Sequence, residues 1–190
     1  MKETIAQGAI EELLVQGLKF TIRDVASRLG MSTKTIYSYF ESKEHIISHI
    51  VDRTVEEMKE AERGIMDDSS LSIRQKMIEA LAVFPRKFAY LDLRIIQGLR
   101  QRYPEQWRKL DEHIQYGWEN IRLLAKEGML EGSFRAFDME LFIQAYIGAL
   151  YHIMDSQVAG KIELTLEKTL EQLAELLMVG IANTPREDVS

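Results

Sequence analysis

The stretch TIRDVASRLGMSTKTIYSYFESK, residues 21–43, is the part of the sequence that decides the fold. Thr21 and Ser32 each stand where a short helix begins, and their hydroxyls can accept hydrogen bonds from its first free backbone N–H groups. Gly30 falls between the two segments, where the absence of a side chain permits a tight turn. Two short helices joined in this way are typical of a helix-turn-helix.

The second segment of this motif presents a polar outer face. The small and apolar residues that fill the space between the two segments are Val25, Ala26, Leu29 and Ile36. The outward positions carry hydroxyls, one amine and a phenol, on Thr33, Lys34, Thr35, Ser38 and Tyr39. Side chains of these types bind phosphate oxygens and base edges in the major groove of DNA. A short helical hairpin that merely has a polar outer face would show much of the same pattern.

Helical periodicity continues through the rest of the chain and predicts an all-α protein. An amphipathic helix over about residues 2–16 precedes the motif, and a long helix starts at about Lys43. We expect Pro104 in the first turn of a later helix, Gly128 at the end of that helix and Asp138 as the N-cap of the next. Five further helices are expected after the long one, roughly at 71–90, 92–102, 105–128, 138–158 and 163–182.

The last two of these helices are apolar around much of their circumference. Helices of this kind need apolar partners on two sides. One partner is the core of the same chain, and the other is a second subunit. The pattern therefore predicts a homodimer that forms through the last two helices.

The charge of the chain is unevenly distributed. The whole sequence has 30 acidic and 24 basic residues, a formal charge of −6, which argues against contact with nucleic acid. Residues 1–53, however, hold seven basic and seven acidic side chains, so the excess of negative charge lies entirely in residues 54–190. A neutral N-terminal segment permits DNA binding without driving it strongly.

The motif has a recognisable context along residues 4–52. The elements of this context are, in chain order, Thr21, Val25-Ala26, Gly30, Ser32, Thr35-Ile36-Tyr37, Tyr39-Phe40 and Ser42-Lys43-Glu44. With these elements at this spacing, the sequence resembles the tetracycline-repressor (TetR) family of bacterial transcriptional regulators. Two positions depart from the usual family pattern: Lys34 stands where a glycine is common, and Tyr39 where a histidine is common.

The resemblance implies a division of labour within the chain. Residues 1–53 are expected to form a three-helix DNA-binding domain, and residues 54–190 a helical domain for ligand binding and dimerisation. The long helix that starts at Lys43 joins the two. We expect a repressor that binds a palindromic operator on double-stranded DNA, with half-sites about 34–36 Å apart, and that releases it on binding a small molecule.

The resemblance also implies which side chains meet DNA. Phosphates are assigned to Thr21, Tyr37, Tyr39 and Lys43, bases to Thr33, Lys34 and Thr35, and Arg23 and Ser32 complete the expected DNA-binding set. Lys43 begins a helix, where the helix dipole disfavours a cation, so a phosphate partner would explain it. An ordinary exposed lysine is the alternative interpretation.

The C-terminal part of the chain holds candidates for an effector pocket. The aromatic residues that we expect to line it are Phe84, Phe88, Trp107, Trp118, Phe142 and Tyr146, although such side chains at helical spacing are more often core. Candidate polar anchors are His113, Gln144 and His152. A pocket of this composition favours a mostly apolar effector.

Other classes of protein fit the sequence less well. His45 and His49 have a zinc-binding spacing, but they lack the HExxH order and a third ligand, so neither a metal nor another cofactor is expected. Glycine-rich phosphate loops and nucleophile–base arrangements are absent from the sequence, which argues against an enzyme. Without cysteines, a visible signal peptide or an apolar run long enough for a bilayer, the chain is expected to be cytoplasmic, with no membrane partner. The alternative function is an all-helical protein-interaction module that does not bind DNA.

Overall fold

The computed structural model describes residues 1–83, 93–153 and 165–182. Within these ranges the regular secondary structure is helical, and the β-type pairing is limited to one isolated bridge between Phe134 and Ala182. The elements are α1 (Lys2–Gln16), the 3₁₀ helix η1 (Gly17–Lys19), α2 (Ile22–Arg28), α3 (Thr33–Tyr37), α4 (Lys43–Asp67), α5 (Ile73–Leu81), α6 (Leu93–Arg102), α7 (Pro104–Tyr116), α8 (Glu119–Glu131), α9 (Met139–Ile153) and α11 (Leu166–Ile181). The expected all-α fold is confirmed.

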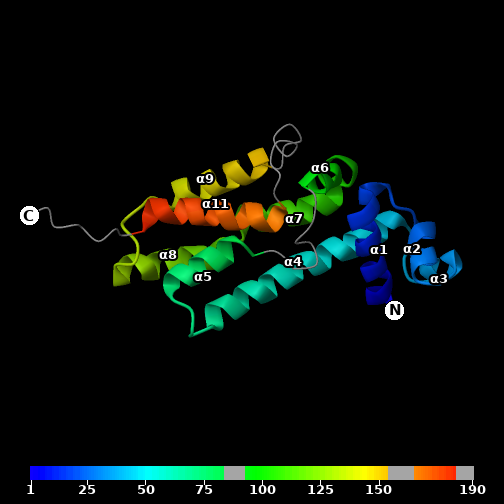
Figure 1. Cartoon of the computed structure of the whole chain (residues 1–190), viewed down its shortest axis with the longest axis horizontal. Coiled ribbons are helices and arrows are strands. Elements are labelled where there is room, and N and C mark those ends of the chain that lie inside the picture. The colour runs from blue at the N-terminus through cyan, green and yellow to red at the C-terminus, as the bar shows by residue number, and fades with distance from the viewer. Residues whose placement is uncertain (84–92, 154–164, 183–190) are drawn as a thin grey trace, which may run out of the picture.

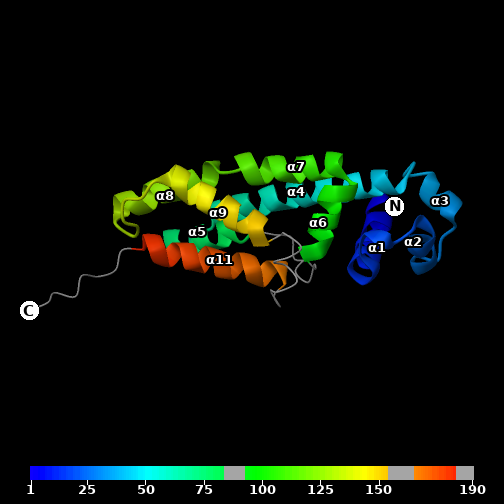
Figure 2. The ribbon, with the colours of Figure 1, turned by 90° about the horizontal axis from the view of Figure 1, so that it is seen from above.

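The helices form an elongated molecule in which α4 joins two parts. At one end, α1, α2 and α3 pack around the start of α4, as Figure 1 shows. From there α4 runs alongside α7 into the larger part, where α5 packs against α8 and α11, and α9 packs against α11 (Figure 2). One buried apolar core extends through both parts.

The helix-turn-helix forms for the local reasons that its sequence indicates. Thr21 caps α2 through a capping box with Asp24, and the Ser32 hydroxyl accepts the Thr35 N–H at 3.0 Å to cap α3. Between the helices Gly30 has a φ of 63°, a conformation that residues with a side chain rarely adopt. Val25, Ala26 and Ile36 are buried where the two helices meet.

The expected single helix over 105–128 is wrong, because the chain breaks between α7 and α8. At the break the Trp118 indole N–H donates to the Ile114 carbonyl at 2.8 Å, while the Trp118 backbone N–H donates to Tyr116. The side chain therefore replaces the backbone donor that a continuous helix would use. A Cβ on Gly117 would lie 2.7 Å from the His113 carbonyl oxygen, so this glycine permits the local path of the chain.

Gly128 does not end a helix as expected, since α8 continues to Glu131. The chain turns at Gly132 instead, where φ is 85°. Pro104 does lie in the first turn of α7, and Asp138 accepts the Leu141 N–H ahead of α9. The expected helices at 71–90, 138–158 and 163–182 are described over shorter ranges, as α5, α9 and α11, and their remaining residues lie partly outside the described ranges.

Across the described ranges, no helix combines the length and the apolar character needed to cross a membrane.

Candidate DNA-binding surface and effector pocket

The outer face of α3 and the turn that follows it are open to solvent. Thr33 and Lys34 are exposed, Thr35 is half-buried, and Tyr37 and Tyr39 remain 53% and 37% exposed. Two apolar residues on the inner side, Ile36 and Phe40, are fully buried, so the phenol rings stay outside while the core holds the helix in place. The expected DNA-facing residues of α3 therefore share one accessible surface.

The two capping residues of the expected DNA-binding set are exposed but already hydrogen-bonded. The Thr21 hydroxyl donates to Asp24 Oδ2 at 2.8 Å and accepts the Asp24 N–H at 3.2 Å. The Ser32 hydroxyl lies 2.9 Å from the hydroxyl of Thr35, in addition to its capping bond. Arg23, in the first turn of α2, is exposed beside Thr21.

Lys43 has partners in the preceding N-terminal segment of the chain. Its Nζ donates to the Leu18 carbonyl at 2.7 Å and lies 4.3 Å from the centroid of the Phe20 ring. Burial lowers the pKa of this ammonium. These contacts give a structural reason for a cation at the start of α4, where the expectation invoked a phosphate.

A partly buried ion pair that sequence reasoning did not single out connects α2 to α1. Glu12 is 6% exposed, and one of its carboxylate oxygens accepts the Arg28 Nε–H at 2.6 Å, while Arg28 also reaches Glu11 at 3.2 Å. The pair connects the first helix of the motif to the helix that supports it. Glu12 lies on the same helical face as the buried Ile5 and Ala9, and an acid on that face was the available signal.

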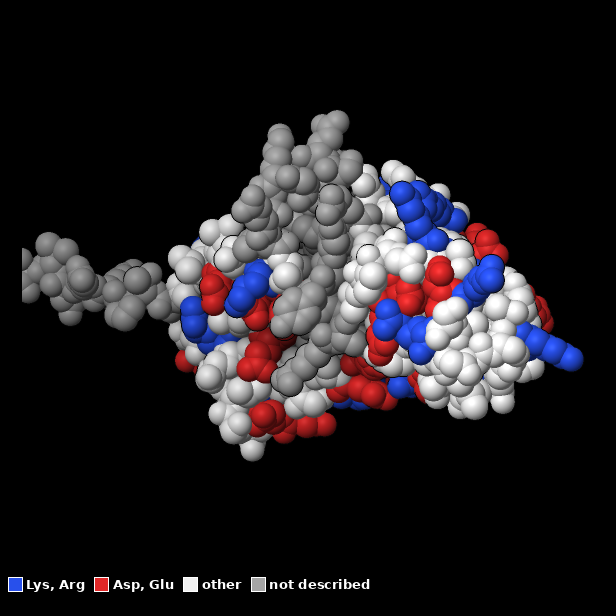
Figure 3. Space-filling view, turned by 45° about the vertical axis from the view of Figure 1, so that its right-hand side comes forward, with Lys and Arg blue, Asp and Glu red and all other residues white. Residues whose placement is uncertain are grey.

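The charge pattern on this end of the molecule is mild. Figure 3 shows a mostly uncharged outer end with isolated basic side chains at its edge, and acidic side chains that gather nearer the middle of the molecule. This agrees with the even balance of acidic and basic residues over 1–53. The groups that this surface offers to a phosphate are hydroxyls and phenols as well as cations.

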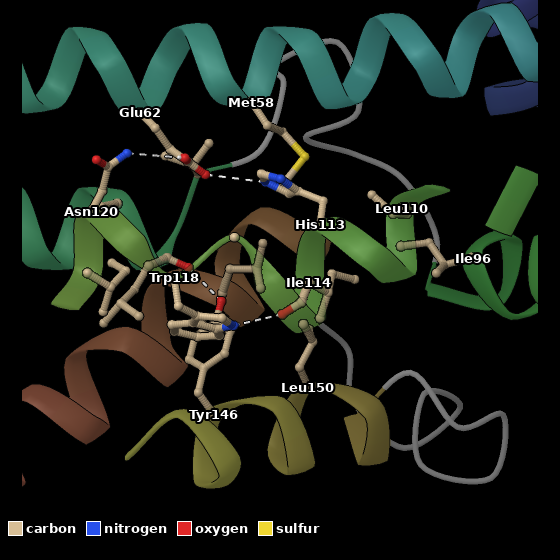
Figure 4. Close-up of a pocket in the computed structure, with 16 residues that line it drawn as sticks. Met58, Glu62, Ile96, Leu110, His113, Ile114, Trp118, Asn120, Tyr146 and Leu150 are labelled. Carbon is tan, nitrogen blue, oxygen red and sulfur yellow. Dashed lines mark hydrogen bonds and ion pairs between the residues drawn. The ribbon is translucent and has the colours of Figure 1, made fainter. Parts of the chain in front are cut away.

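A pocket of about 90 Å³, hereafter the central pocket, lies in the larger part of the molecule. Its wall is formed by residues of α4, α5, α6, α7, α8, α9 and α11 and of the α7–α8 and α5–α6 connections. Most of these side chains are apolar, and Figure 4 shows Glu62, His113 and Asn120 grouped on the side nearest α4. The described lining residues are Met58, Glu62, Ala80, Leu81, Val83, Ile96, Leu110, His113, Ile114, Gly117, Trp118, Asn120, Ile121, Tyr146, Leu150 and Leu170.

The residues expected to form an effector pocket have different positions in the structure. Trp118 and Tyr146 line the central pocket with their rings edge to face, the centroids 5.3 Å apart. Trp107 and Phe142 are buried away from it, and Phe84 and Phe88 lie outside the described residues. Of the expected polar anchors, His113 lines the pocket, whereas Gln144 and His152 are exposed on α9.

Sequence reasoning missed Glu62 and Asn120 as residues of the pocket. Glu62 Oε1 lies 3.3 Å from His113 Nε2, and its Oε2 accepts a hydrogen bond from Asn120 Nδ2 at 3.5 Å. Glu62 lies one helical turn beyond Met58 on the inward face of α4, so a single acid in that apolar stripe was the available signal. Nothing comparable distinguishes Asn120 in the sequence.

A second cavity, of about 60 Å³ and hereafter the joint cavity, lies where the two parts of the molecule meet. Its wall combines Leu13, Leu18 and Phe20 of the N-terminal part with residues of α4, α6 and α7. Ile96 and Leu110 line both the joint cavity and the central pocket. Close by, α6 approaches η1 so tightly that a Cβ on Gly98 would lie 2.9 Å from a methyl group of Leu18.

Comparison with known proteins agrees with this arrangement. Residues 5–50, which contain the helix-turn-helix, match the family described as bacterial regulatory proteins, tetR family. A curated protein of Bacillus subtilis (strain 168), the uncharacterized HTH-type transcriptional regulator YvaF, is 28% identical over 175 residues, which are 92% of this chain and 92% of that protein.

Solved structures share the fold over nearly the whole chain. The TetR-family regulator PfmR of Thermus thermophilus has a TM-score of 0.63 at 20% identity, with 92% of this chain and 97% of that one covered. The regulator FadR of Bacillus subtilis, solved in complex with stearoyl-CoA, has a TM-score of 0.63 at 20% identity, with 95% and 100% covered. A TetR/AcrR-family regulator of Thermobifida fusca has a TM-score of 0.64 at 24% identity, with 94% and 97% covered.

The family match covers the helix-turn-helix, the curated relative extends the likeness along most of the chain, and the solved structures share its fold. Residues 5–50 carry the helix-turn-helix segment of the tetR family of bacterial regulatory proteins, and along most of its length the chain is similar to an HTH-type transcriptional regulator.

Proposed function

We propose that the protein is a repressor that binds a palindromic operator as a homodimer and releases it when a small, mostly apolar molecule occupies the central pocket. The observation that carries this proposal is the course of α4. The helix begins at Lys43, directly after the helix-turn-helix, and continues without a break to Met58 and Glu62 in the pocket wall. A displacement of α4 at the pocket would therefore also move the helix-turn-helix at its other end.

The exposed apolar surface of the last two helices supports the homodimer. Leu141 on α9, with Leu176 and Val179 on α11, are 70%, 72% and 74% exposed. Large apolar side chains on adjacent helices are costly to leave in water, and a second copy of the same surface would cover them. Two DNA-binding ends held in this way match the two halves of a palindrome.

The domain boundary belongs to the proposal as well. We assign residues 1–53 to DNA binding and 54–190 to ligand binding and dimerisation. The boundary falls inside α4, so the two functions share one helix rather than a flexible linker. Because bacterial DNA lies in the cytoplasm, the proposal also places the protein there.

The composition of the central pocket supports an apolar effector, since most of its described wall is apolar. The FadR neighbour, whose solved complex contains stearoyl-CoA, is an example of this fold with a long apolar chain bound. We assign Trp118 and Tyr146 to the wall of the effector site on their position in the pocket. Trp107 and Phe142 contribute to the core around it.

The test begins with selection of DNA fragments by the purified protein and sequencing of those that it retains. We expect the fragments to share a palindrome, and we expect binding to weaken steeply as salt rises, because Lys34 and its neighbours meet phosphates and bases. Lys34→Ala and Tyr37→Ala should each weaken operator binding by about tenfold or more in a gel-shift or anisotropy titration. Lys59→Ala, an exposed lysine on α4 outside the motif, is the matched control and should bind normally.

Retained fragments without a shared palindrome would contradict the dimeric repressor. Unchanged operator binding by both Lys34→Ala and Tyr37→Ala would contradict the assignment of the DNA-binding surface. If the protein dimerises but retains no DNA at low salt, the alternative of a helical protein-interaction module is favoured instead.

A further inference from the structure

The polar groups of the two aromatic side chains in the wall of the central pocket, Trp118 and Tyr146, already have hydrogen-bond partners within the protein. The Trp118 indole N–H donates to the Ile114 carbonyl at 2.8 Å, and the Tyr146 hydroxyl donates to the carbonyl of Leu81. Burial raises the pKa of the Tyr146 phenol, so the hydroxyl stays neutral. Both side chains therefore offer a ligand mainly apolar ring surface.

Glu62 differs, because its carboxylate has acceptor capacity left over. Its two oxygens meet one donor each, His113 Nε2 at 3.3 Å and Asn120 Nδ2 at 3.5 Å, and both distances are long for hydrogen bonds. A carboxylate can accept about four hydrogen bonds. In Figure 4 Glu62 extends from α4 between these two partners on the pocket side of the helix.

The described residues of the pocket wall place no side chain with a fixed positive charge beside the Glu62 carboxylate. The Glu62 side chain is 16% exposed and the His113 side chain 9% exposed, so both are largely removed from water. Among the described lining residues there is no lysine or arginine. A carboxylate in such surroundings is stabilised by a positive charge brought to it, and an anion placed there is repelled.

His113 is held in the orientation that this arrangement needs. The ring lies against Gly117, where an added Cβ would be 3.1 Å from His113 Nδ1, and its Nε2 points to Glu62. The tautomer that carries its proton on Nε2 can donate to one carboxylate oxygen, and each of the two oxygens then keeps a lone pair for a further donor. Glu62, His113 and Asn120 are thus positioned from three helices, α4, α7 and α8.

From this geometry we propose that the effector is an apolar amine, whose ammonium group donates to Glu62 while its apolar body fills the rest of the central pocket. The inference rests on the proposed function and adds to it the chemical class of the effector. Trp118 and Tyr146 supply the ring surface against which the apolar body packs. The amine class differs from the anionic stearoyl-CoA found with the FadR neighbour.

The test compares three probes of one chain length, octylammonium, 1-octanol and octanoate, by isothermal titration calorimetry on the full-length protein without DNA. We expect octylammonium to bind about tenfold more tightly than 1-octanol, and octanoate to bind most weakly. A Trp107→Phe variant leaves Trp118 as the sole tryptophan of the chain, so its fluorescence reports whether the probe enters the central pocket.

The role of Glu62 is tested with Glu62→Gln, which keeps the shape and removes the charge. We expect octylammonium affinity to fall about tenfold or more and 1-octanol affinity to stay within about twofold. Glu60→Gln, an exposed acid on the same helix, is the matched control and should leave both affinities unchanged. The ranking of the three probes is measured on the unaltered chain, so it remains decisive even if Glu62→Gln folds poorly.

The proposal is overturned if octanoate binds as tightly as octylammonium, if no probe binds at millimolar concentration, or if Glu62→Gln retains octylammonium affinity. Failure of the proposed function has a different signature. If octylammonium binds the protein in the expected order but does not release the operator, the amine class stands and the ligand-controlled repressor does not.

Discussion

At the residue scale, the protonation state of the Asp24 carboxylate affects the stability of the first turn of the helix-turn-helix. It accepts hydrogen bonds from the Thr21 N–H at 2.7 Å and from the Thr21 hydroxyl at 2.8 Å. These bonds hold the pKa of the Asp24 carboxyl below its ordinary value of 3.8. The ionised form is therefore favoured by the folded state over the unfolded chain.

The contribution of the Asp24 carboxylate to the stability of the fold therefore depends on pH. Because the pKa of Asp24 is lower in the folded state, its contribution is fully present above the unfolded pKa and is lost as pH falls through the folded pKa. We expect the free energy of unfolding of Asp24→Asn to be lower than that of the unaltered chain by a constant amount above about pH 5. The difference should narrow below about pH 4, as urea titrations at a series of pH values would measure.

Two comparisons sharpen this prediction. Thr21→Ala removes the hydroxyl bond but not the backbone bond, so it should reduce the pH-dependent difference without abolishing it. Glu60→Gln supplies the effect of removing one exposed carboxylate from a helix surface. A difference between Asp24→Asn and the unaltered chain that stays constant down to the lowest accessible pH would refute the capping account.

Residues of the motif could be predicted from the sequence because their roles are local. A cap, a turn glycine and a buried apolar residue depend on neighbours a few positions away, and Thr21, Gly30, Ser32 and Ile36 have the predicted structural positions. The partners of Lys43 were not predictable in this way, because Leu18 and Phe20 lie more than 20 positions before it in the sequence.

At the element scale, two glycines in helices have opposite surroundings. Gly128 lies inside α8, and a Cβ there would be 2.2 Å from the buried Phe134 ring. Gly64 lies inside α4, where an added Cβ meets nothing within 4 Å. Intrinsic helix propensity favours alanine at both positions, so only packing distinguishes them.

We therefore expect opposite effects from the same substitution. Gly64→Ala should raise the free energy of unfolding by about 0.5–1 kcal/mol, because alanine restricts the unfolded chain and favours the helix. Gly128→Ala should lower it by about 1–3 kcal/mol, because the Phe134 ring has to move out of a packed position. Denaturant unfolding of the two variants against the unaltered chain measures both changes, and stabilisation by Gly128→Ala would show that α8 does not pack as described.

The packing of Gly128 explains why the sequence-based prediction of a helix end at this residue is wrong. Reading Gly128 as the end of a helix applies the ordinary meaning of glycine in a helical sequence. Its actual role, to let Phe134 approach α8, depends on a residue beyond the turn at Gly132. The break before Trp118 was missed for a related reason, since the apolar spacing of the sequence continues across it while an indole replaces one backbone donor.

At the scale of the whole molecule, the apolar faces of α9 and α11 are the feature that the sequence predicted well. Composition alone shows that these helices have more apolar surface than one core can cover, and Leu141, Leu176 and Val179 are exposed in the structure. The effector pocket was less predictable. It combines side chains from seven helices, and an aromatic residue in the sequence does not reveal whether it faces a cavity or the packed core.

We expect Leu176→Glu to convert the proposed dimer to a monomer, because the charge would be buried between two copies of α11. Operator affinity should fall by about tenfold or more in the same variant, since one DNA-binding end contacts only one half-site. Analytical ultracentrifugation measures the first effect and a gel-shift titration the second.

Leu130→Glu is the matched control for this prediction, because Leu130 is 79% exposed on α8, which is not one of the two helices of the proposed interface. It should leave both the mass and the operator affinity unchanged. A dimer that survives Leu176→Glu would place the interface on another surface of the molecule.

The wall shared by the two cavities has a consequence for which molecules can act as signals. Ile96 and Leu110 line the central pocket on one side and the joint cavity on the other. We expect a short occupant of the central pocket to leave these two side chains in place, and a longer one to displace them toward Leu18 in the wall of the joint cavity. Compounds below a certain length should then bind without changing operator affinity, whereas longer ones should lower it. A homologous series of amines should therefore divide into inert binders and inducers.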